Sequence, residues 1–335
     1  MKRLELLEKS KEKMIANHLS TSTIESYLSV VNQFFTWLLA TPSALKMTYS
    51  ERMEAYLTWR VREKNISRST QNVDFNALLF LGRHILHENI DKIDALRAGK
   101  TSRIPHILNE RQIDLLFKSL PGEYLLISKL LYGAGLRINE CLRIRIKDVD
   151  LSLNKLLIHE GKGNKDGIVP IPKSLLPEIE TQMENAIAQW KKDRKQKLAG
   201  VHIPNALAVK YKSASTSKDW YWLFPNPVIS IDPESGILRR HHVYDFAVQE
   251  AFVATRRKAG LPEHITPHTL RHCYATHFMQ SLLRQGVPER MAEEKLVEYL
   301  RHSSRDTLKW YLHLATPENV LIESPLDRMS SGKEE

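Results

Sequence analysis

Four side chains in the C-terminal third of the chain have the chemistry to cleave a phosphodiester bond. They are His268, Arg271, His302 and Tyr311. All four reach one shared site if the residues between them fold back as helices. A guanidinium binds phosphate oxygens, an imidazole moves a proton or donates a hydrogen bond, and a phenol can act as the nucleophile. This combination predicts phosphoryl transfer that needs no metal ion.

Two earlier segments supply further basic groups. The sequence Gly-Ala-Gly-Leu-Arg-Ile-Asn-Glu at 133–140 places Arg137 just after a predicted helix stop. The sequence Gly-Lys-Gly-Asn-Lys-Asp-Gly at 161–167 separates two strand-like segments, and its turn-forming residues predict a hairpin. Lys162 is therefore expected near the tip of the hairpin, within reach of a substrate. The turn is not a P-loop, because no Gly-Lys-Ser or Gly-Lys-Thr follows.

Each of these residues also has an ordinary structural interpretation. Arg137 could cap a helix or form a salt bridge with Glu140, and Tyr311 could belong to an amphipathic helix. The histidines between 268 and 277 have no carboxylate or cysteine at a familiar metal-binding spacing, so we expect no metal site. The conjunction of residues, rather than any member, indicates catalysis.

Charge indicates the kind of partner. The 335 residues include 49 Lys and Arg against 39 Asp and Glu, which gives a formal net charge of +10. Such a balance suits a polyanion and makes association long-ranged and sensitive to salt. A basic protein that binds no nucleic acid is the alternative, and charge alone separates the two only weakly. The length is sufficient for two domains.

The residues also predict a compartment. Cys141 and Cys273 are the two cysteines, and they are most simply reduced, buried thiols. The charged N-terminus lacks the apolar run of a signal peptide, and the most apolar stretch, 30–40, is interrupted and too short to span a bilayer. We expect a soluble, cytoplasmic protein with no membrane association and no cofactor.

Periodicity predicts a helical N-terminal domain. Apolar residues recur at steps of three and four over 24–38, and similar stripes predict helices over 51–64 and from Ser67 to Ile85. Helices of this kind bury their stripes against one another. Arg68 lies in a polar connection where a helix N-terminus can bind DNA phosphate; a solvated loop charge is the alternative.

The periodicity breaks at a basic segment that contains Gly and Pro, which we interpret as a linker over 99–107 between domains 1–98 and 108–335. The next helix is predicted to begin at Asn109, with Gln112 as its capping-box partner.

The second domain is predicted to mix helices with a small sheet. Residues 155–159 and 168–171 are strand-like, and 174–197 form an amphipathic helix. The segment 200–242 has little helical periodicity, and we name it the insert. Its candidate DNA-binding residues are Trp220, Arg239, Arg240, His241 and His242. Aromatic and basic side chains together suit unpaired bases and phosphates, although tryptophans that pack a small core of the insert are about equally expected.

The ordered motifs resemble those of the tyrosine recombinases of the phage integrase family, and most of all the integron integrases. They are Leu-Leu-Tyr-Gly-Ala-Gly-Leu-Arg-Ile-Asn-Glu-Cys (130–141), Gly-Lys-Gly (161–163), His-Thr-Leu-Arg-His (268–272) and Ser-Pro-Leu-Asp (324–327). Asp-Pro-Glu-Ser (232–235) with Arg-Arg-His-His (239–242) resembles the extra segment of integron integrases. The resemblance implies an α+β, mainly helical fold: a SAM-like, core-binding N-terminal domain, then a catalytic domain with a small antiparallel sheet.

The resemblance also implies a role for each residue. Arg137 and Arg271 would bind the scissile phosphate, and Lys162 would protonate the leaving 5′-oxygen. His268 would assist Tyr311, the nucleophile that forms a 3′-phosphotyrosyl bond, and His302 would hydrogen-bond the phosphate.

The expected partner is DNA, as a double-stranded attachment site and as folded single-stranded cassette sites. The insert around Trp220 and His241 would read extruded bases. A homotetramer on DNA is implied, with the tail 317–335 docked on a neighbouring protomer or folded onto its own domain.

Two features depart from the family pattern. The interval from Arg271 to His302 spans 31 positions, roughly two helical turns more than usual, with the surplus within 281–297. Arg301 replaces the usual glycine, although an arginine enters a left-handed turn less easily. A catalytically silent DNA-binding relative is therefore the second hypothesis, and a relaxase of the topoisomerase IB kind the third.

Overall fold

The computed structural model describes residues 3–99, 106–161, 165–233, 235–301 and 315. The chain divides into two compact units, Met1–Arg103 and Ile104–Glu335. We describe each unit by itself and name the second the catalytic unit. None of the described helices combines the length and hydrophobicity that a membrane crossing requires.

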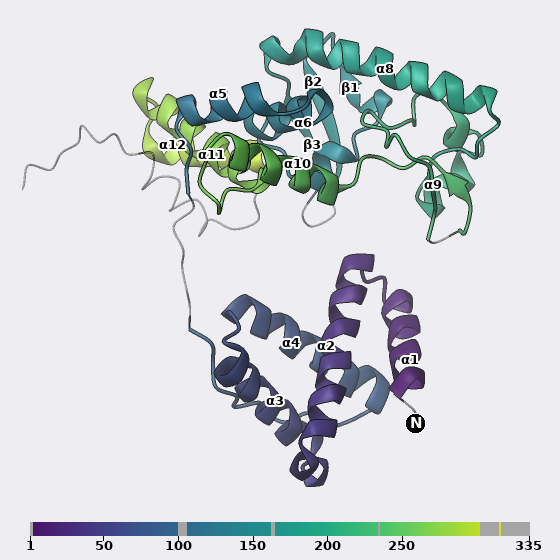
Figure 1. Cartoon of the computed structure of the whole chain (residues 1–335), viewed down its shortest axis with the longest axis vertical. Helices are drawn as coiled ribbons and strands as arrows, with labels where there is room; N and C mark the ends of the chain where they lie inside the picture. The colour runs from purple at the N-terminus through teal and green to yellow at the C-terminus, as the bar shows by residue number, and fades with distance from the viewer. Residues whose placement is uncertain (1–2, 100–105, 162–164, 234, 302–314, 316–335) are drawn as a thin grey trace, which may run out of the picture. The chain divides into compact units, whose positions relative to one another are not determined.

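The described part of the N-terminal unit is helical (Figure 1). Its helices are α1 (Arg3–Ala16), α2 (Thr21–Ala40), α3 (Tyr49–Lys64) and α4 (Arg68–Leu81), with shorter turns η1 (Pro42–Lys46) and η2 (Gly82–Leu86). Ser20, Thr48 and Ser67 cap α2, α3 and α4 by accepting a hydrogen bond from the backbone N–H three residues on. The helices predicted over 24–38 and 51–64 and after Ser67 are confirmed. Helix α1 was not predicted, because it buries only three residues.

Aromatic side chains form the centre of the N-terminal unit. The rings of Phe34 and Tyr56 meet edge to face, with centroids 5.2 Å apart, and both side chains are buried. Tyr49 is also buried, and its hydroxyl donates to the carbonyl of Leu78 at 2.7 Å, which joins α3 to α4. The unit therefore has a hydrophobic core of its own.

The catalytic unit combines helices with two small sheets (Figure 1). Its helices are α5 (Glu110–Ser119), α6 (Gly122–Gly133), α7 (Ile138–Leu142), α8 (Leu176–Lys195), α9 (Asn205–Lys210), α10 (Asp245–Lys258), α11 (Pro267–Arg284) and α12 (Glu289–Leu300), with 3-10 turns η3 (Ile146–Asp148), η4 (Lys173–Leu175) and η5 (Ala214–Thr216). The strands are β1 (Val149–Asp150), β2 (Lys155–Gly161), β3 (Lys165–Pro170), β4 (Ser230–Ile231) and β5 (Leu238–Arg239). Asn109 caps α5 in a capping box with Gln112, as predicted.

The larger sheet is antiparallel in the order β1-β2-β3. Leu156 pairs with Val169, and both face the core, whereas Ile168 on the opposite face of β3 is 62% exposed. This alternation is the period-two pattern of a half-buried sheet. The strands predicted on either side of the 161–167 turn are confirmed.

The core of the catalytic unit forms where α6 packs on α11. Ile127 and Leu130 of α6 lie in one buried cluster with Leu270 of α11, and α12 packs on the far end of α11 through Leu296 and Leu300. Cys141 and Cys273 are both buried and free. Burial raises the pKa of both thiols, which keeps them protonated and inert.

The insert forms a small core against α8. Tyr221 and Trp222 are buried there with Val201, whereas Trp220 remains half-buried. The interpretation that the tryptophans pack a small core of the insert is confirmed for Trp222, and the DNA-binding role of Trp220 stays a prediction.

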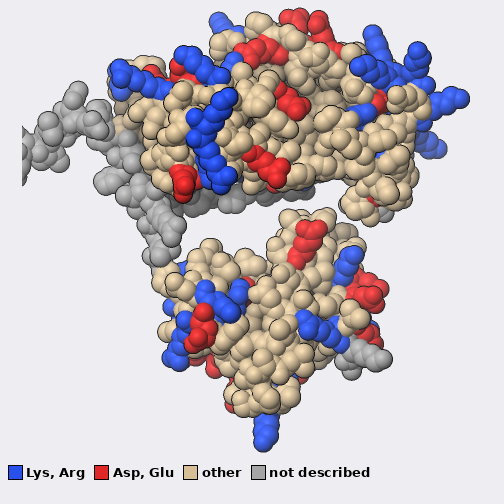
Figure 2. All heavy atoms as spheres, viewed as in Figure 1, with Lys and Arg blue, Asp and Glu red and all other residues tan. Residues whose placement is uncertain are grey.

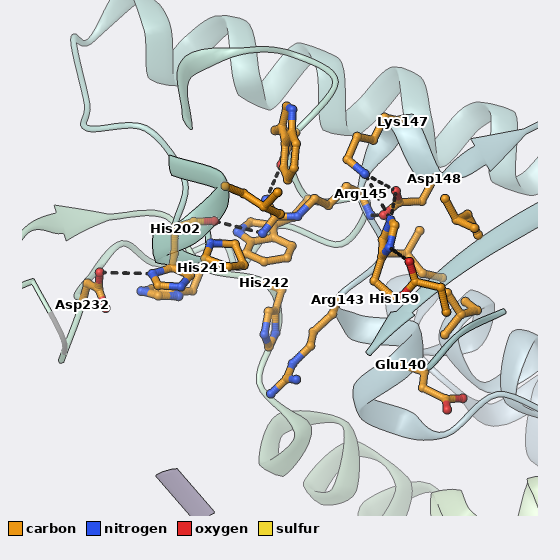
Figure 3. A pocket seen from close by; sticks show the side chains of 18 of the residues that line it. Glu140, Arg143, Arg145, Lys147, Asp148, His159, His202, Asp232, His241 and His242 are labelled. Carbon is orange, nitrogen blue, oxygen red and sulfur yellow. Dashed lines mark hydrogen bonds and ion pairs between the residues drawn. The ribbon is translucent and has the colours of Figure 1, made fainter. Parts of the chain in front are cut away.

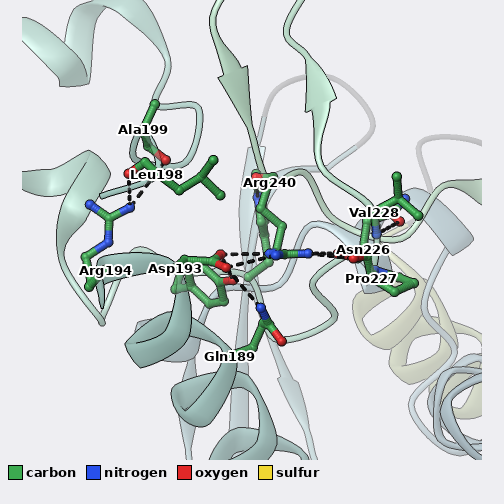
Figure 4. A network of polar contacts seen from close by, with 11 residues as sticks. Gln189, Asp193, Arg194, Leu198, Ala199, Asn226, Pro227, Val228 and Arg240 are labelled. Atoms are coloured by element: carbon green, nitrogen blue, oxygen red, sulfur yellow. Dashed lines mark hydrogen bonds and ion pairs between the residues drawn. The ribbon is translucent and has the colours of Figure 1, made fainter. Parts of the chain in front are cut away.

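An ion pair fastens the insert to α8 (Figure 4). Arg240 holds both carboxylate oxygens of Asp193, at 2.7 and 2.8 Å, and also donates to the carbonyls of Asn226 and Pro227. Tyr221 and Gln189 donate to the same carboxylate. Burial alone would raise the pKa of Asp193, but these hydrogen bonds lower it.

Candidate active site

Arg137 lies where α6 gives way to α7. Helix α6 ends at Gly133, and Gly135 follows with φ +62°. A Cβ at Gly135 would lie 2.5 Å from the ring of Tyr274, so the position requires glycine twice over, for its backbone and for space. The chain then turns so that Arg137 becomes the N-cap of α7.

The guanidinium of Arg137 binds Glu140. Its Nη1 lies 2.5 Å from Oε1 of Glu140, and its backbone N–H donates to Oε2 at 2.9 Å. The salt bridge that the sequence offered as the ordinary role of Arg137 is thus present. The side chain is still 22% exposed, so the pairing does not remove the guanidinium from the surface.

Arg271 is the most deeply buried cation of the site, with 2% of its side chain exposed. It lies on α11, just after the first turn, in which Thr266 and Thr269 form a capping box. Nη2 donates to the carbonyl of Leu300 at 2.6 Å, and Nη1 donates to the carbonyl of Gly135. Nη1 also lies 3.8 Å from Oε2 of Glu140. The guanidinium thus ties the end of α12 to the segment that carries Arg137.

His268 and His272 stand one turn apart on α11 with ring centroids 4.7 Å apart. Burial lowers the pKa of His268, and the positive charges of Arg271 and Arg137 lower it further. Burial, His268 and Arg271 lower the pKa of His272 to about 4. Both imidazoles are therefore neutral at pH 7, the state in which His268 can accept a proton or a hydrogen bond.

A third arginine joins this group. Nη2 of Arg301 lies 2.6 Å from Oε2 of Glu140, whose side chain is only 7% exposed. Burial alone would raise the pKa of Glu140, but Arg301 and Arg137 outweigh it and keep the carboxylate charged. We name Arg137, Glu140, Arg271 and Arg301 the Glu140 cluster. Sequence reasoning treated Glu140 only as a partner of Arg137 and missed its link to Arg301.

The backbone of Arg301 is in the left-handed region, with φ 50° and ψ 44°, where it ends α12. This conformation costs a residue with a Cβ roughly 1 kcal/mol relative to glycine. Arg301 thus adopts the left-handed turn at the position where the family pattern usually has glycine. The residue that bears this conformational cost also forms the ion pair with Glu140.

The structure thus brings together Arg137, at the start of α7, with His268 and Arg271, which both lie on α11. Lys162, His302 and Tyr311 lie outside the described residues, so their roles stay predictions. In the described ranges, no group of three His, Cys, Asp or Glu side chains has an arrangement that could hold a metal ion.

A second feature of the catalytic unit is a cavity of about 750 Å³ beside the insert (Figure 3), which we name the insert cavity. Lys147, Asp148 and His159 lie on one side of it, and His202, His241 and Asp232 lie on the other. Nζ of Lys147 is 2.7 Å from Oδ1 of Asp148, and His159 lies 3.0 Å from the same oxygen. Glu140 also lines the cavity, so the cavity begins beside the Glu140 cluster.

Arg145 forms the back of the insert cavity. Its guanidinium carbon lies 3.9 Å from the ring centroid of Trp222 and 5.3 Å from that of Trp220. It also donates to the carbonyls of Trp220 and His202, at 2.6 and 2.9 Å. The aromatic wall of the cavity is therefore held in place by a buried cation.

The predicted DNA-binding residues have different environments. Arg68 is exposed at the first position of α4, and Trp220, His241 and His242 line the insert cavity. Burial lowers the pKa of His241 and of His242, so both are neutral at pH 7. Arg239 is 11% exposed and faces Asp232 at 3.4 Å.

Arg240 needs a correction. It is buried and bonded to Asp193, so a DNA contact would strand a buried carboxylate, and we remove it from the set. Its partner lies 47 residues away in sequence, and for this reason the pairing was not predicted.

Comparison with known proteins identifies the family. The profile of the phage integrase family matches residues 96–318, and that of the phage integrase N-terminal SAM-like domain matches residues 6–92. The chain belongs to the phage integrase family. The family resemblance drawn from the motifs is thereby confirmed, as is the mainly helical fold with an N-terminal SAM-like domain and a catalytic domain. A member of this family is a tyrosine recombinase, an enzyme of site-specific DNA recombination.

Individual relatives agree with the family profile. An integrase/recombinase of Escherichia coli is 34% identical over 331 residues, which cover 98% of this chain and 95% of that protein. The tyrosine recombinase XerA of Thermococcus kodakarensis is 28% identical and covers 84% of this chain and 89% of that protein. Among solved structures, lambda integrase bound to a core site has a TM-score of 0.59 at 14% identity, covering 92% of this chain and 94% of that one. That likeness supports the integrase fold.

Proposed function

We propose that this tyrosine recombinase is an integron integrase that inserts and excises gene cassettes. Support comes from the motifs of the insert and from the insert cavity, whose aromatic and cationic walls suit a nucleobase. A volume of about 750 Å³ is within the range of small-molecule sites. We propose that Trp220, His241 and His242 receive bases extruded from folded single-stranded sites.

We propose a transesterification for the chemical step. The phenolic oxygen of Tyr311 attacks the scissile phosphorus while the bond to the 5′-oxygen breaks, and Lys162 gives that oxygen its proton. His268 accepts the phenolic proton, and His302 hydrogen-bonds the phosphate. Attack by another 5′-hydroxyl reverses the step and releases Tyr311, so the phosphotyrosyl bond conserves the energy of the linkage.

The single observation that carries this mechanism is the convergence of Arg137 and Arg271 on one site through Glu140 and the carbonyls of Gly135 and Leu300, with His268 close enough to feel the charge of both arginines. Two fixed guanidinium groups can hold the phosphate oxygens as charge develops, and a neutral histidine beside them can take a proton.

Further parts of the proposal concern assembly. We propose that the enzyme works as a homotetramer on DNA in the cytoplasm, with the tail 317–335 docked on a neighbouring protomer; that tail lies outside the described residues. Domain 1–98 grips the attachment site with Arg68 on a phosphate, 99–107 links it to domain 108–335, and Arg239 contacts DNA beside the insert. Crosslinked protomers that disappear when residues 317–335 are deleted would support the docking.

The decisive experiment uses a suicide substrate. A duplex carrying the attachment site next to the gene is nicked beside the scissile phosphate, so that the leaving fragment diffuses away and the covalent adduct accumulates. We expect an adduct that resists denaturation with the wild type and none with Tyr311→Phe. No adduct with the wild type, or an undiminished adduct with Tyr311→Phe, would refute the proposal.

Two further measurements separate the other hypotheses. Site-specific binding without an adduct would indicate a silent DNA-binding relative, and efficient relaxation of plasmid that carries no site would indicate a relaxase. For the integron assignment, we expect the folded bottom strand of a cassette site to be cleaved, and Trp220→Ala to impair that substrate more than the double-stranded site. Equal loss on both substrates would contradict the role of the insert cavity.

A further inference from the structure

Arg301 links three elements of the catalytic unit: α7, β3 and the end of α12. Its guanidinium binds Glu140, which in turn holds Arg137. Its side chain also lies against β3, because a Cβ at Gly167 would be only 2.5 Å from Cδ of Arg301. Along the chain, it follows Leu300, whose carbonyl accepts from Arg271, and precedes His302.

The end of α12 does not itself require an arginine. A left-handed residue at a helix end is the position where glycine fits without strain. Glycine would end the helix at least as well, so the addition made by arginine is its side chain. That side chain is 13% exposed and contacts Glu140, Gly167 of β3 and the carbonyl of Tyr299.

Arg301 also changes the charge available to a phosphate. With Arg301 bound to Oε2 of Glu140, the side chain of Arg137 engages Oε1. Three guanidinium groups then lie within 4 Å of one carboxylate, which leaves the Glu140 cluster with a net positive charge that can attract a phosphate. Arg301, at 2.6 Å, shares the negative charge of Glu140 with Arg137, at 2.5 Å, whereas Arg271 is 3.8 Å away. Without Arg301, more of the charge of Arg137 would be offset by Glu140 and less would be available to a phosphate.

We propose that Arg301 is a positioning residue for strand cleavage. It holds Glu140 of α7, Gly167 of β3 and the end of α12 in one arrangement, and thereby positions Arg137, through Glu140, and Arg271, through the carbonyl of Leu300, for the phosphate. This inference rests on the proposed roles of those two arginines.

The main test replaces Arg301 with glycine. Arg301→Gly removes the guanidinium and relieves the backbone, while Glu140 keeps Arg137 as its partner, so we expect a thermal midpoint within a few degrees of the wild type. With the nicked duplex at saturating protein, we expect adduct formation to slow about tenfold or more, because small misplacements of catalytic groups are costly. The dissociation constant for uncleaved DNA should stay within about twofold of the wild type.

The matched control is His87→Gly. His87 also has a left-handed backbone, at φ 56°, ends η2 in the N-terminal unit and is exposed. The same relief of the backbone at this position should leave the rate of adduct formation unchanged.

Two variants that keep a side chain at position 301 test whether the slower rate comes from the loss of the guanidinium or from the glycine backbone. Arg301→Lys retains the charge and should recover part of the rate, whereas the neutral Arg301→Gln should not. If Arg301 acts through Glu140, Arg301→Gln combined with Glu140→Gln should be no slower than the slower single variant. If the double variant lost rate by the product of the two single losses, the proposed route through Glu140 would be overturned.

The outcomes distinguish a failure of this inference from a failure of the proposed function. An Arg301→Gly variant that forms adduct at the wild-type rate would overturn the inference, and so would a loss of DNA affinity as large as its loss of rate. A wild type that forms no adduct would instead overturn the proposed function.

Discussion

At the scale of single residues, the arginines of the Glu140 cluster do different work. Arg271 is almost fully buried and donates to two backbone carbonyls, whereas Arg137 keeps part of its guanidinium exposed. The planar guanidinium allows one residue to join two carbonyls and still present charge. Arg271 is therefore expected to matter for stability as well as for catalysis.

The first prediction tests that double role. Arg271→Leu removes the donors to the carbonyls of Gly135 and Leu300 and should lower the free energy of unfolding by about 3 kcal/mol. Urea denaturation measures the loss. Arg290→Leu is the control: that side chain is 90% exposed on α12, and its replacement should change stability by less than about 0.5 kcal/mol. If Arg271→Leu lost no more stability than Arg290→Leu, the buried hydrogen bonds of Arg271 would contribute nothing to the free energy of unfolding.

The second prediction concerns pH. The pKa of His272 is about 4 in the folded protein against 6.5 when unfolded, so the unfolded chain binds more protons between these values. Folding stability should therefore fall as pH drops from 6.5 towards 4. We expect His272→Asn to lose less stability than the wild type over this range, by on the order of 2 kcal/mol. Thermal melts at pH 7.5 and pH 5 measure this difference. If the wild type and His272→Asn lost the same stability between these pH values, the low pKa of His272 would be contradicted.

At the scale of elements, the turn between α11 and α12 accommodates the surplus residues of the long interval between Arg271 and His302. Helix α11 ends at Arg284, Gly286 follows with φ +77°, and α12 begins at Glu289 and packs back on α11. The long interval thus returns the chain to Leu300, where Arg271 binds its carbonyl.

The third prediction tests this turn. A Cβ at Gly286 meets no atom within 4 Å, so Gly286→Ala should cost only backbone strain, about 1 kcal/mol. That cost corresponds to a fall of about 2–4 °C in the thermal midpoint of a unit this size. Gly122→Ala, also with open space but in the first turn of α6, should be neutral or stabilising. A harmless Gly286→Ala would show that this turn is not held left-handed.

Local signals were predictable from the sequence, and distant pairings were not. The capping box of Asn109 and Gln112 and the β2–β3 hairpin depend on neighbouring residues, and both were predicted. The candidate arginines were found by their motifs. The ion pairs of Arg240 with Asp193 and of Arg301 with Glu140 join residues 47 and 161 positions apart, and no local pattern signals such contacts.

At the scale of the whole molecule, the chain has a net positive charge and two units that each have their own core. The N-terminal core and the core of the catalytic unit involve separate sets of side chains. Figure 2 shows Lys and Arg side chains gathered at the end of the catalytic unit where α8 ends, and the last turn of α8 includes Lys192 and Lys195. Charge of this kind favours DNA of any sequence.

The fourth prediction follows from the separate cores. A fragment of residues 1–99 should fold alone, with helical circular dichroism and cooperative thermal unfolding. Its affinity for the attachment site should be at least about tenfold weaker than that of the full chain, because linking two binding units raises their effective concentration. Affinity of both proteins should fall linearly with the logarithm of salt, more steeply for the full chain. Equal slopes would show that one unit makes all the phosphate contacts.

The ion pair of Arg240 and Asp193 has a consequence for the history and engineering of the enzyme. Asp193 belongs to α8, whereas Arg240 and Tyr221 belong to the insert. Loss of Arg240 alone, with the rest of the insert in place, would leave the buried carboxylate of Asp193 without its cation, a change that typically costs about 3–5 kcal/mol. Substitutions at positions 193 and 240 are therefore coupled, and a neutral pair would have to be introduced at both. In this way, one buried pair ties the sequence of the insert to that of α8.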